Sequence, residues 1–206
     1  MSDRDKLIDW AIELQQISQS ALYFCKNEYD IERFERVRQI SAEIMALKSG
    51  LDINVVKGLF CNEVGYQTPK IDTRAALFRD NKILLVQENT GFWALPGGWA
   101  DIGNSLKENA LRELWEEAGI KGEAKTLVAC IDKSYSTLKR HPFGVYSFLI
   151  LCEYIEGEFK PNIETIASDY FSRDNLPELA PFKTTIEQID LSFEAHFSQN
   201  WKTRFD

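Results

Sequence analysis

The stretch PGGWADIGNSLKENALRELWEEAGI, residues 96–120, constrains this chain more than any other. A glycine pair leads into a segment with helical spacing that carries Glu113, Glu116 and Glu117. Residues three and four apart lie on one face of an α-helix, so the three carboxylates come together. They repel one another unless cations hold them. Because magnesium and manganese prefer such oxygen ligands, the sequence predicts a metal site on this helix.

The ends and the packing of this helix are also predicted. Ser105 and Glu108 have the spacing of a capping box, in which each side chain accepts a hydrogen bond from the other residue's backbone amide. Gly119 stands where a left-handed residue ends a helix. The residues expected to dock on the core, opposite the acidic face, are Leu111, Leu114, Trp115 and Ala118.

An acidic amphipathic helix, taken alone, is typical of a solvated surface. Its combination with the glycine pair and a loop of fixed length is rarer and resembles the signature of the Nudix hydrolases. That signature reads Gly, five residues, Glu, seven residues, Arg-Glu-aliphatic, one residue, Glu-Glu, one residue, Gly-aliphatic. The positions in register are Gly98, Arg112, Glu113, Leu114, Glu116, Glu117, Gly119 and Ile120. Asn104 stands where the signature has Glu, which leaves any loop-anchoring role of that carboxylate in doubt, although we expect catalysis to survive.

The resemblance implies a metal-dependent pyrophosphohydrolase. Such an enzyme cleaves the diphosphate of a small nucleoside diphosphate derivative, of the CDP-choline or ADP-ribose type, by attack of water on phosphorus. It would use Mg²⁺ or Mn²⁺, two or three ions. The metal ligands that the resemblance implies are Glu113, Glu116 and Glu117 with a carbonyl of Gly97 or Gly98. Arg112 lies four residues before Glu116 and is expected to orient it.

The general base of this family often lies outside the signature, on a loop after the central strands. The acids available there are Glu153, Glu156, Glu158, Glu164 and Asp169. We choose Glu164, because Glu164-Thr165 followed by Tyr170-Phe171 resembles the corresponding loop and strand of relatives; a solvated loop carboxylate is the alternative. The expected substrate contacts are Arg74, Trp99, Lys139, Arg140 and Tyr66, and Phe143 is a further residue that could stack on a base. A lone strand arginine is more often a surface residue, however, and such aromatics are more often core residues.

Two other functions stay open. One is RNA-end processing, against which the net charge of −8 and the lack of a basic stripe count. The other is a non-catalytic sensor of a nucleotide ligand, against which the intact helix carboxylates count. The acidic balance predicts no broad nucleic-acid surface, so metal ions would attract an anionic substrate locally.

Hydrophobic periodicity divides the chain into a helical module, residues 1–66, and a second domain, residues 67–206. The first contains helical patterns before and after residue 27 and a short helix with a linker over 51–69. The second has strand patterns at 71–78 and 82–87, joined by Asp80-Asn81, then at 127–132 and 143–154, and a helical pattern at 184–200. This pattern predicts an α/β fold with a mixed sheet between helices, and the resemblance specifies the Nudix α/β/α sandwich.

The helical module resembles the N-terminal extension of a subfamily similar to bacterial CDP-choline and ADP-ribose pyrophosphatases. The residues that carry this likeness are Trp10, Leu14-Gln15, Tyr29-Asp30, Glu32-Arg33-Phe34 and 66–70. Its apolar stripe, Leu7, Trp10, Ala11, Leu14, Ile17 and Ala21, has to be buried somewhere, and we expect a homodimer. The widely spaced cysteines and the polar start of the chain predict a cytoplasmic protein with no membrane segment.

Overall fold

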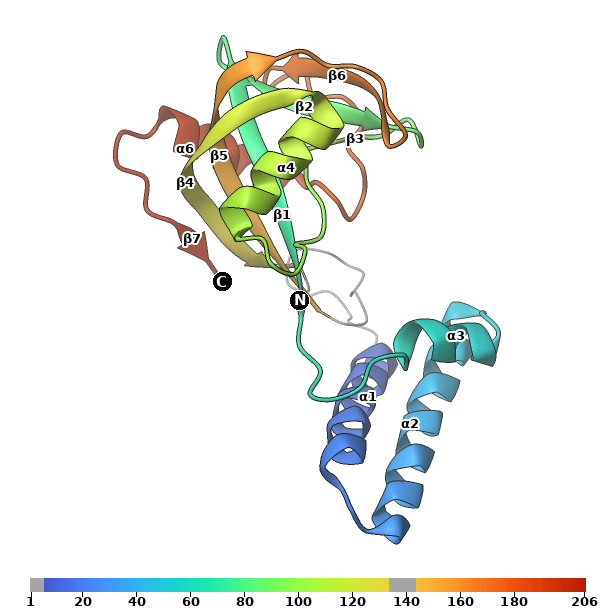
Figure 1. Cartoon of the computed structure of the whole chain (residues 1–206). Helices are drawn as coiled ribbons and strands as arrows, with labels where there is room; N and C mark the ends of the chain where they lie inside the picture. The colour runs from blue at the N-terminus through green and yellow to red at the C-terminus, as the bar shows by residue number, and fades with distance from the viewer. Residues whose placement is uncertain (1–5, 134–143) are drawn as a thin grey trace. The chain divides into compact units, whose positions relative to one another are not determined.

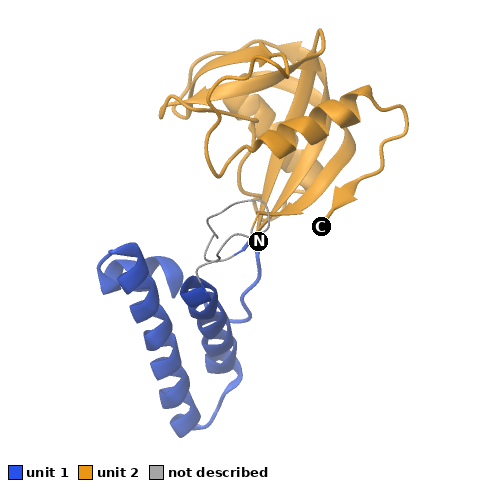
Figure 2. Ribbon diagram, turned by 180° about the vertical axis from the view of Figure 1, so that it is seen from behind, with its two compact units in different colours: residues 1–69, 138–144 blue, residues 70–137, 145–206 orange. Residues whose placement is uncertain are grey.

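The computed structural model describes residues 6–133 and 144–206, which form two compact units (Figure 2). Of the described residues, the helical unit comprises 6–69 and 144, and the sheet unit comprises 70–133 and 145–206. In the described part of the chain, no helix is long and apolar enough to cross a membrane.

The helical unit contains α1 (Lys6–Phe24), α2 (Glu28–Ser49) and α3 (Ile53–Phe60) (Figure 1). The side chain of Asn27 caps α2 by accepting hydrogen bonds from the amides of Tyr29 and Asp30. This cap fixes the start of the helix at Glu28. Gly50 ends α2 in the left-handed conformation, with φ 72°. The helices therefore lie where the periodicity predicted them.

Small side chains form the contact between α1 and α2. Ala11 and Ser41 are fully buried, and the Ser41 hydroxyl donates a hydrogen bond of 2.7 Å to the Ala11 carbonyl. Trp10 and Ile17, two residues of the apolar stripe that we expected a homodimer to bury, are 53% and 49% exposed within this chain. The period was right, and α2 covers a neighbouring strip of the helix surface that is small and polar.

The sheet unit is built on a seven-stranded mixed sheet in the order β3-β2-β1-β5-β4-β7, with β6 paired to β2. The strands are β1 (Lys70–Arg79), β2 (Lys82–Glu88), β3 (Trp93–Ala94), β4 (Ile120–Asp132), β5 (Val145–Gly157), β6 (Thr165–Phe171) and β7 (Arg204–Phe205). The central strands β1 and β5 run parallel, with Ala75 opposite Ile150. Strands β2 and β4 continue the sheet antiparallel on either side of this pair.

Two helices cover opposite faces of this sheet. They are α4 (Leu106–Ala118) and α6 (Ile186–Phe197), as Figure 1 shows. Successive strand residues alternate between the two cores: Leu77 packs in the core under α4, whereas Ala76 packs in the core under α6. The predicted α/β/α sandwich with a mixed sheet is confirmed.

The local predictions were accurate, and the errors concern pairing. Asp80 and Asn81 have φ 50° and 57°, as a tight hairpin between β1 and β2 requires. Strand β4 begins at Ile120, directly after the helix, because its first half pairs along β5. The alternating polar residues of that half hid it from the sequence prediction. Strands β3, β6 and β7 were not assigned as strands.

Candidate active site

The glycine loop, residues 95–100, runs along the central strand β1. The Ala75 amide donates to the Pro96 carbonyl at 2.8 Å, and the Thr73 amide donates to the Gly98 carbonyl at 2.9 Å. Gly97 has φ 154°, and a Cβ there would lie 2.0 Å from the carbonyl oxygen of Thr73. Only glycine can therefore bring the backbone this close to the strand.

Helix α4 places its acidic residues against this loop. Its N-terminus has the predicted capping box, and Gly119 ends it in the left-handed conformation. Glu113 and Glu117 are only 7% and 8% exposed, whereas Glu116 is exposed. The Gly97 amide donates to Oε2 of Glu117 at 2.8 Å. At Gly98, a Cβ would stand 2.7 Å from Oε1 of Glu113, so the missing side chain leaves the space that this carboxylate occupies.

Burial and crowding make these carboxylates hard to ionise. Burial raises the pKa of Glu117 to about 7, against the Gly97 hydrogen bond and the positive charge of Arg74, which lower it. The pKa of Glu113 is also raised, chiefly by burial and then by the neighbouring Glu116, although Arg112 opposes this. The negative charge of Glu164 adds to the rise at both residues. A cation at this place would relieve the repulsion.

Glu164 is held near the helix by the residues on either side of it. The Asn162 side chain donates 2.8 Å to the Glu116 carbonyl and accepts a hydrogen bond of 2.8 Å from the Glu164 amide. The Thr165 hydroxyl donates 2.7 Å to the Glu117 carbonyl. These bonds fasten the start of β6 to the last turn of α4. The exposed carboxylate of Glu164 thereby comes within electrostatic range of the two buried ones.

Arg112 contacts both of its acidic neighbours on the helix. Its Nη1 lies 2.5 Å from Oε2 of Glu116, the predicted contact, and its Nη2 lies 2.8 Å from Oε1 of Glu113. The carboxylates are thus held by a guanidinium on one side and, at Glu117, by the glycine loop.

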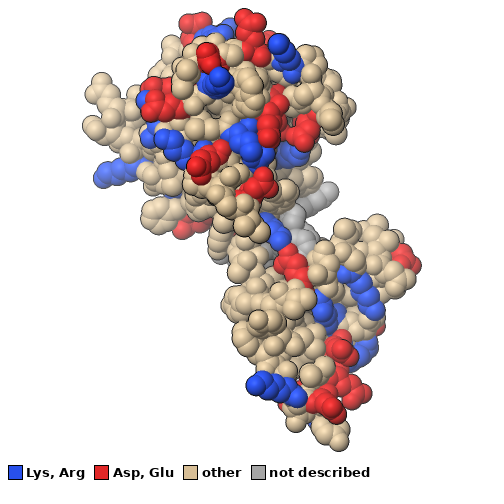
Figure 3. Space-filling model, in the orientation of Figure 1, with Lys and Arg blue, Asp and Glu red and all other residues tan. Residues whose placement is uncertain are grey.

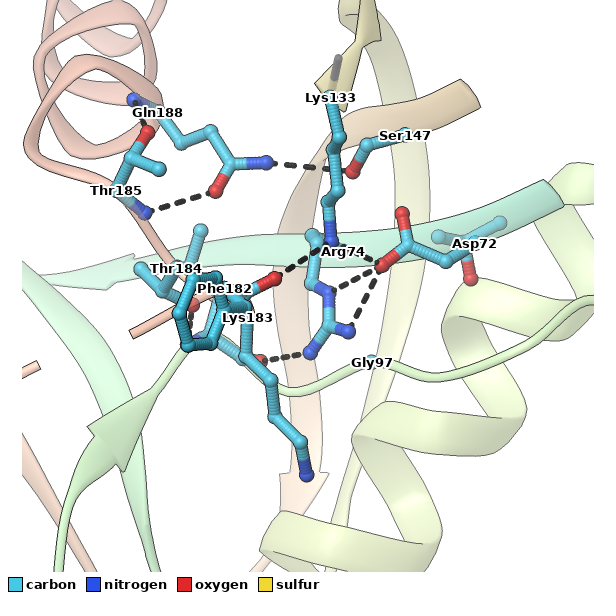
Figure 4. Close-up of polar contacts among 12 residues, drawn as sticks. Asp72, Arg74, Gly97, Lys133, Ser147, Phe182, Lys183, Thr184, Thr185 and Gln188 are labelled. Atoms are coloured by element: carbon cyan, nitrogen blue, oxygen red, sulfur yellow. Dashed lines mark hydrogen bonds and ion pairs between the residues drawn. The ribbon is translucent and has the colours of Figure 1, made fainter. Parts of the chain in front are cut away.

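A buried charge cluster lies on the other side of the loop (Figure 4). Arg74, 5% exposed, donates from Nη2 to Oδ2 of Asp72 at 2.8 Å and from Nη1 to the Leu95 carbonyl at 3.3 Å. The Lys133 ammonium lies 2.7 Å from the same Asp72 oxygen. Burial alone would raise the pKa of Asp72, but Arg74 and Lys133 outweigh it and lower the pKa. Two cations thus meet one carboxylate, which leaves an excess positive charge beside the glycine loop.

This local charge matters because the surface carries no comparable field on the side drawn in Figure 3. There, acidic and basic side chains are interspersed.

The family model for the NUDIX domain matches residues 69–191, the range that contains the glycine loop, α4 and the Glu164 loop.

The chain belongs to the Nudix hydrolases.

The helical unit of this Nudix hydrolase also has a match. The model described as "UDP-X-like, N-terminal oligomerisation domain" covers residues 5–60. Two full-length likenesses agree with that organisation. A Bacillus subtilis protein, provisionally named ADP-ribose pyrophosphatase, is 39% identical over 98% of this chain and 97% of its own length. The crystal structure of a UDP-X diphosphatase is 30% identical, with a TM-score of 0.64, over 98% of this chain and 99% of that one.

A third relative is similar to about two thirds of this chain. The crystal structure of an ADP-ribose pyrophosphatase from Streptococcus suis is 51% identical, with a TM-score of 0.64. It covers 68% of this chain and 100% of its own. Relatives with these names support a hydrolase of the ADP-ribose pyrophosphatase kind.

Nudix hydrolases generally need divalent metal ions, and the donor set here fits such an ion. The oxygen donors are the buried carboxylates of Glu113 and Glu117, whose pKa values are raised. They lie beside Gly98, where an added Cβ would collide with Glu113. Across residues 6–133 and 144–206, no three Asp, Glu, His or Cys side chains are grouped closely enough to hold an ion. Two of the carboxylates, Glu113 and Glu116, are in contact with Arg112.

The predicted substrate residues are only partly brought together. Trp99 follows the glycine pair and is 51% exposed. Arg74 is beside the loop but points inward to Asp72. Tyr66 belongs to the helical unit and is 67% exposed, while Lys139, Arg140 and Phe143 lie outside the described residues. Trp115, expected in the core, is 50% exposed and lies under the Lys121 ammonium, 5.6 Å from its ring centre.

Several residues of the site were missed from the sequence. Asp72 stands two positions before Arg74, and this spacing puts both on one face of a strand, so the pair could have been found. Asn162, after Pro161, is a typical turn former whose side chain accepts amides of the next residues. Lys133 carried no signal, because only the folded sheet brings it to Asp72.

Proposed function

We propose that this chain hydrolyses the diphosphate of an ADP-ribose-type nucleoside diphosphate derivative, with Mg²⁺ or Mn²⁺ as the required ion. One observation carries the proposal: Glu113 and Glu117 are buried beside the glycine loop, with Glu164 in electrostatic range of both. Anions collected in this way favour a bound divalent cation, and a diphosphate is the kind of ligand that such cations hold.

The residues that would hold the metal are Glu113, Glu116 and Glu117, together with the Gly97 carbonyl. Gly98 is the weaker backbone donor because its carbonyl already accepts the Thr73 amide. Bound ions would neutralise charge on the phosphate oxygens and lower the pKa of water. Arg112 would then keep Glu116 in place while Glu113 turns from the guanidinium toward the ion.

In the reaction, Glu164 accepts a proton from the attacking water. The water oxygen bonds to one phosphorus, the bridging P–O bond breaks, and the second phosphate leaves with the bridging oxygen. ADP-ribose would give AMP and ribose 5-phosphate. Asn162 and Thr165 hold the base at the end of α4, so its distance from the helix carboxylates is set by two hydrogen bonds. Glu116 and Arg112 complete the proposed catalytic set.

The substrate side is proposed as follows. Trp99, half exposed next to the glycine pair, offers a ring on which a base can stack. Arg74 acts through its charge, because its guanidinium is already bonded to Asp72 and Leu95. Tyr66, Lys139 and Arg140 remain further proposed contacts.

The choice of ADP-ribose rests on the names of the relatives. Two of those most similar to this chain are named for ADP-ribose, whereas the second full-length likeness is named for UDP-X compounds. CDP-choline remains the other substrate of the proposed class. RNA-end hydrolysis belongs in the same test, because an NAD-capped RNA hydrolase of Vibrio atlanticus is 30% identical over 55% of this chain and 41% of its own.

The helical unit is proposed to form a homodimer. Trp10, Ile17 and Phe24 follow one another at intervals of seven residues and are 53%, 49% and 67% exposed. Residues at this interval share one face of a helix, as in the seam of a coiled coil. The match to an oligomerisation domain over residues 5–60 supports a second copy of this chain as the occupant of that face.

The test is a substrate panel with purified protein and either Mg²⁺ or Mn²⁺. The panel contains ADP-ribose, CDP-choline, UDP-sugars and NAD-capped RNA, and the nucleoside monophosphate released is measured by chromatography. We expect the highest kcat/KM with ADP-ribose and no release in excess EDTA. Faster release from capped RNA would replace the substrate assignment. Absence of release from every compound, with metal binding demonstrated, would favour a ligand sensor.

A further inference from the structure

The glycine loop continues into a turn whose acidic residue is not the one that the signature specifies. Asn104, where the signature has Glu, is neutral and cannot form an ion pair. Asp101 stands three residues earlier, and its Oδ2 lies 3.1 Å from Nη2 of Arg112. The Asn104 amide donates to the Asp101 carbonyl at 3.2 Å, which closes the turn and keeps the two positions adjacent.

Asn109 links the same turn to the core. It is fully buried on α4, and its Oδ1 accepts hydrogen bonds from the Asp101 amide at 3.2 Å and from Nη2 of Arg112 at 2.9 Å. Its Nδ2 donates to the Thr73 hydroxyl on β1 at 2.8 Å. All of these bonds agree on one orientation of the amide, so the loop, the helix and the central strand are joined through one side chain.

The guanidinium of Arg112 is where this network meets the carboxylates. Its Nη2 contacts Asp101, Asn109 and Glu113, and its Nη1 contacts Glu116. A shift of the loop end of the network would therefore move the guanidinium and, with it, the two carboxylates proposed as metal ligands. Asn109 and Asp101 are not part of the signature.

We propose that Asp101 takes the loop-anchoring place left open by Asn104, and that Asn109 is the buried link through which it acts. Both are positioning residues for the metal ligands, not catalytic ones. The inference rests on the proposed metal-dependent function, and it predicts how this chain keeps that function with a neutral residue at position 104. The opposing explanation is an ordinary surface ion pair, because Asp101 has a side-chain exposure of 65% and such pairs contribute little.

The test compares Asp101→Asn with Asp190→Asn. Asp190 is a matched control because it also forms an ion pair, with Arg173 at 3.0 Å. It lies on α6, the helix that covers the face of the sheet opposite to α4. Binding of Mn²⁺ is measured by calorimetry without substrate, and kcat and KM are measured with ADP-ribose. We expect Asp101→Asn to weaken Mn²⁺ binding and lower kcat by about tenfold each, with KM and the melting temperature nearly unchanged. Asp190→Asn should leave metal binding and kcat within about twofold.

The decisive variant restores a carboxylate at the other position. In the Asp101→Asn background, Asn104→Glu is expected to recover most of the lost Mn²⁺ affinity, because it restores the acid that the signature has at position 104, in the turn that the Asp101 carbonyl closes. Equal behaviour of Asp101→Asn and Asp190→Asn would overturn the inference, as would a double variant no better than Asp101→Asn. The calorimetry needs no turnover, so it decides this question even if the panel of substrates shows no hydrolysis.

Discussion

The backbone amide of Gly97 donates a 2.8 Å hydrogen bond to Oε2 of Glu117, a carboxylate that burial and neighbouring acids keep hard to ionise. The bond joins the loop proposed to supply a carbonyl ligand to the helix proposed to supply carboxylates. It also lowers the pKa of Glu117, so the pKa of about 7 already includes the opposing effect of this hydrogen bond.

The stability of the metal-free protein should depend on the ionisation of Glu117. The pKa of Glu117 is about 7 in the folded chain, against an ordinary value of 4.5. The stability that the protonated side chain contributes to folding is therefore fully present below about pH 4.5 and is lost as the pH rises through about 7. The full loss is about 3 kcal/mol in the free energy of unfolding. Urea unfolding in EDTA at about pH 5 and about pH 8 measures most of this loss.

Glu117→Gln is the comparison for this measurement, since it removes the titration and keeps the shape. We expect the wild-type protein to lose more stability than the variant between the two pH values. Saturating Mg²⁺ should remove most of that difference by favouring the charged carboxylate. Equal losses in wild type and variant would show that Glu117 titrates near its ordinary value.

Alanine substitutions at Gly97 and at Gly98 should have different effects on stability and metal binding. Alanine at Gly97 would place Cβ 2.0 Å from a backbone oxygen of β1, so the loop has to leave the strand and the melting temperature should fall by several degrees or more. Alanine at Gly98 meets the end of the Glu113 side chain, which can move. We therefore expect Gly98→Ala to fold and to lose about tenfold or more in Mn²⁺ affinity and kcat. Equal melting temperatures for the two variants would contradict this assignment.

Replacement of the proposed base should slow the reaction and spare the metal. Glu164→Gln is expected to lower kcat by ~10²-fold or more while Mn²⁺ affinity measured by calorimetry changes little. Glu153→Gln, which removes an exposed acid paired with Lys125, is the control and should keep its rate. An unchanged kcat in Glu164→Gln would remove this residue from the mechanism. Asn162→Ala should show a weaker form of the same defect, because it loosens the loop without removing the carboxylate.

The exposed strip of α1 should control assembly. Trp10→Glu and Ile17→Glu put charges into the proposed interface and should shift the protein from dimer to monomer in light scattering. Val64→Glu changes an equally apolar residue of the helical unit that is 83% exposed, and it should leave the mass unchanged. Dimers of unchanged stability in both α1 variants would place the interface elsewhere.

What the sequence predicted well depends on neighbouring residues. The capping box of α4, its left-handed end at Gly119 and the hairpin at Asp80-Asn81 all use local hydrogen bonds or local dihedral preferences, so short motifs carry the information. The three glutamates could be placed on one helix for the same reason. The burial of Glu113 and Glu117 could not be predicted, because it depends on how the glycine loop lies against β1.

What the sequence did not predict depends on distant residues. Lys133 reaches Asp72 only because the sheet is folded, and β6 is defined by its pairing with β2 rather than by its own alternation. The apolar spacing of α1 identified the helix, but it did not show which of its residues contact α2. Ala11 is buried there while Trp10, next to it, is exposed, since the partner helix selects small residues that allow close approach.

The hydrogen bonds from Thr73 and Ala75 to the glycine loop make that loop behave as an additional strand on the most central part of the sheet. Opening of the loop would leave these two amides of a buried strand without their acceptors, which costs free energy. We therefore expect the glycine loop to stay in place during turnover. Motions that admit substrate or release product are then expected in other segments of the chain. Slow amide hydrogen exchange at Thr73 and Ala75 is the result that we expect if the loop stays in place.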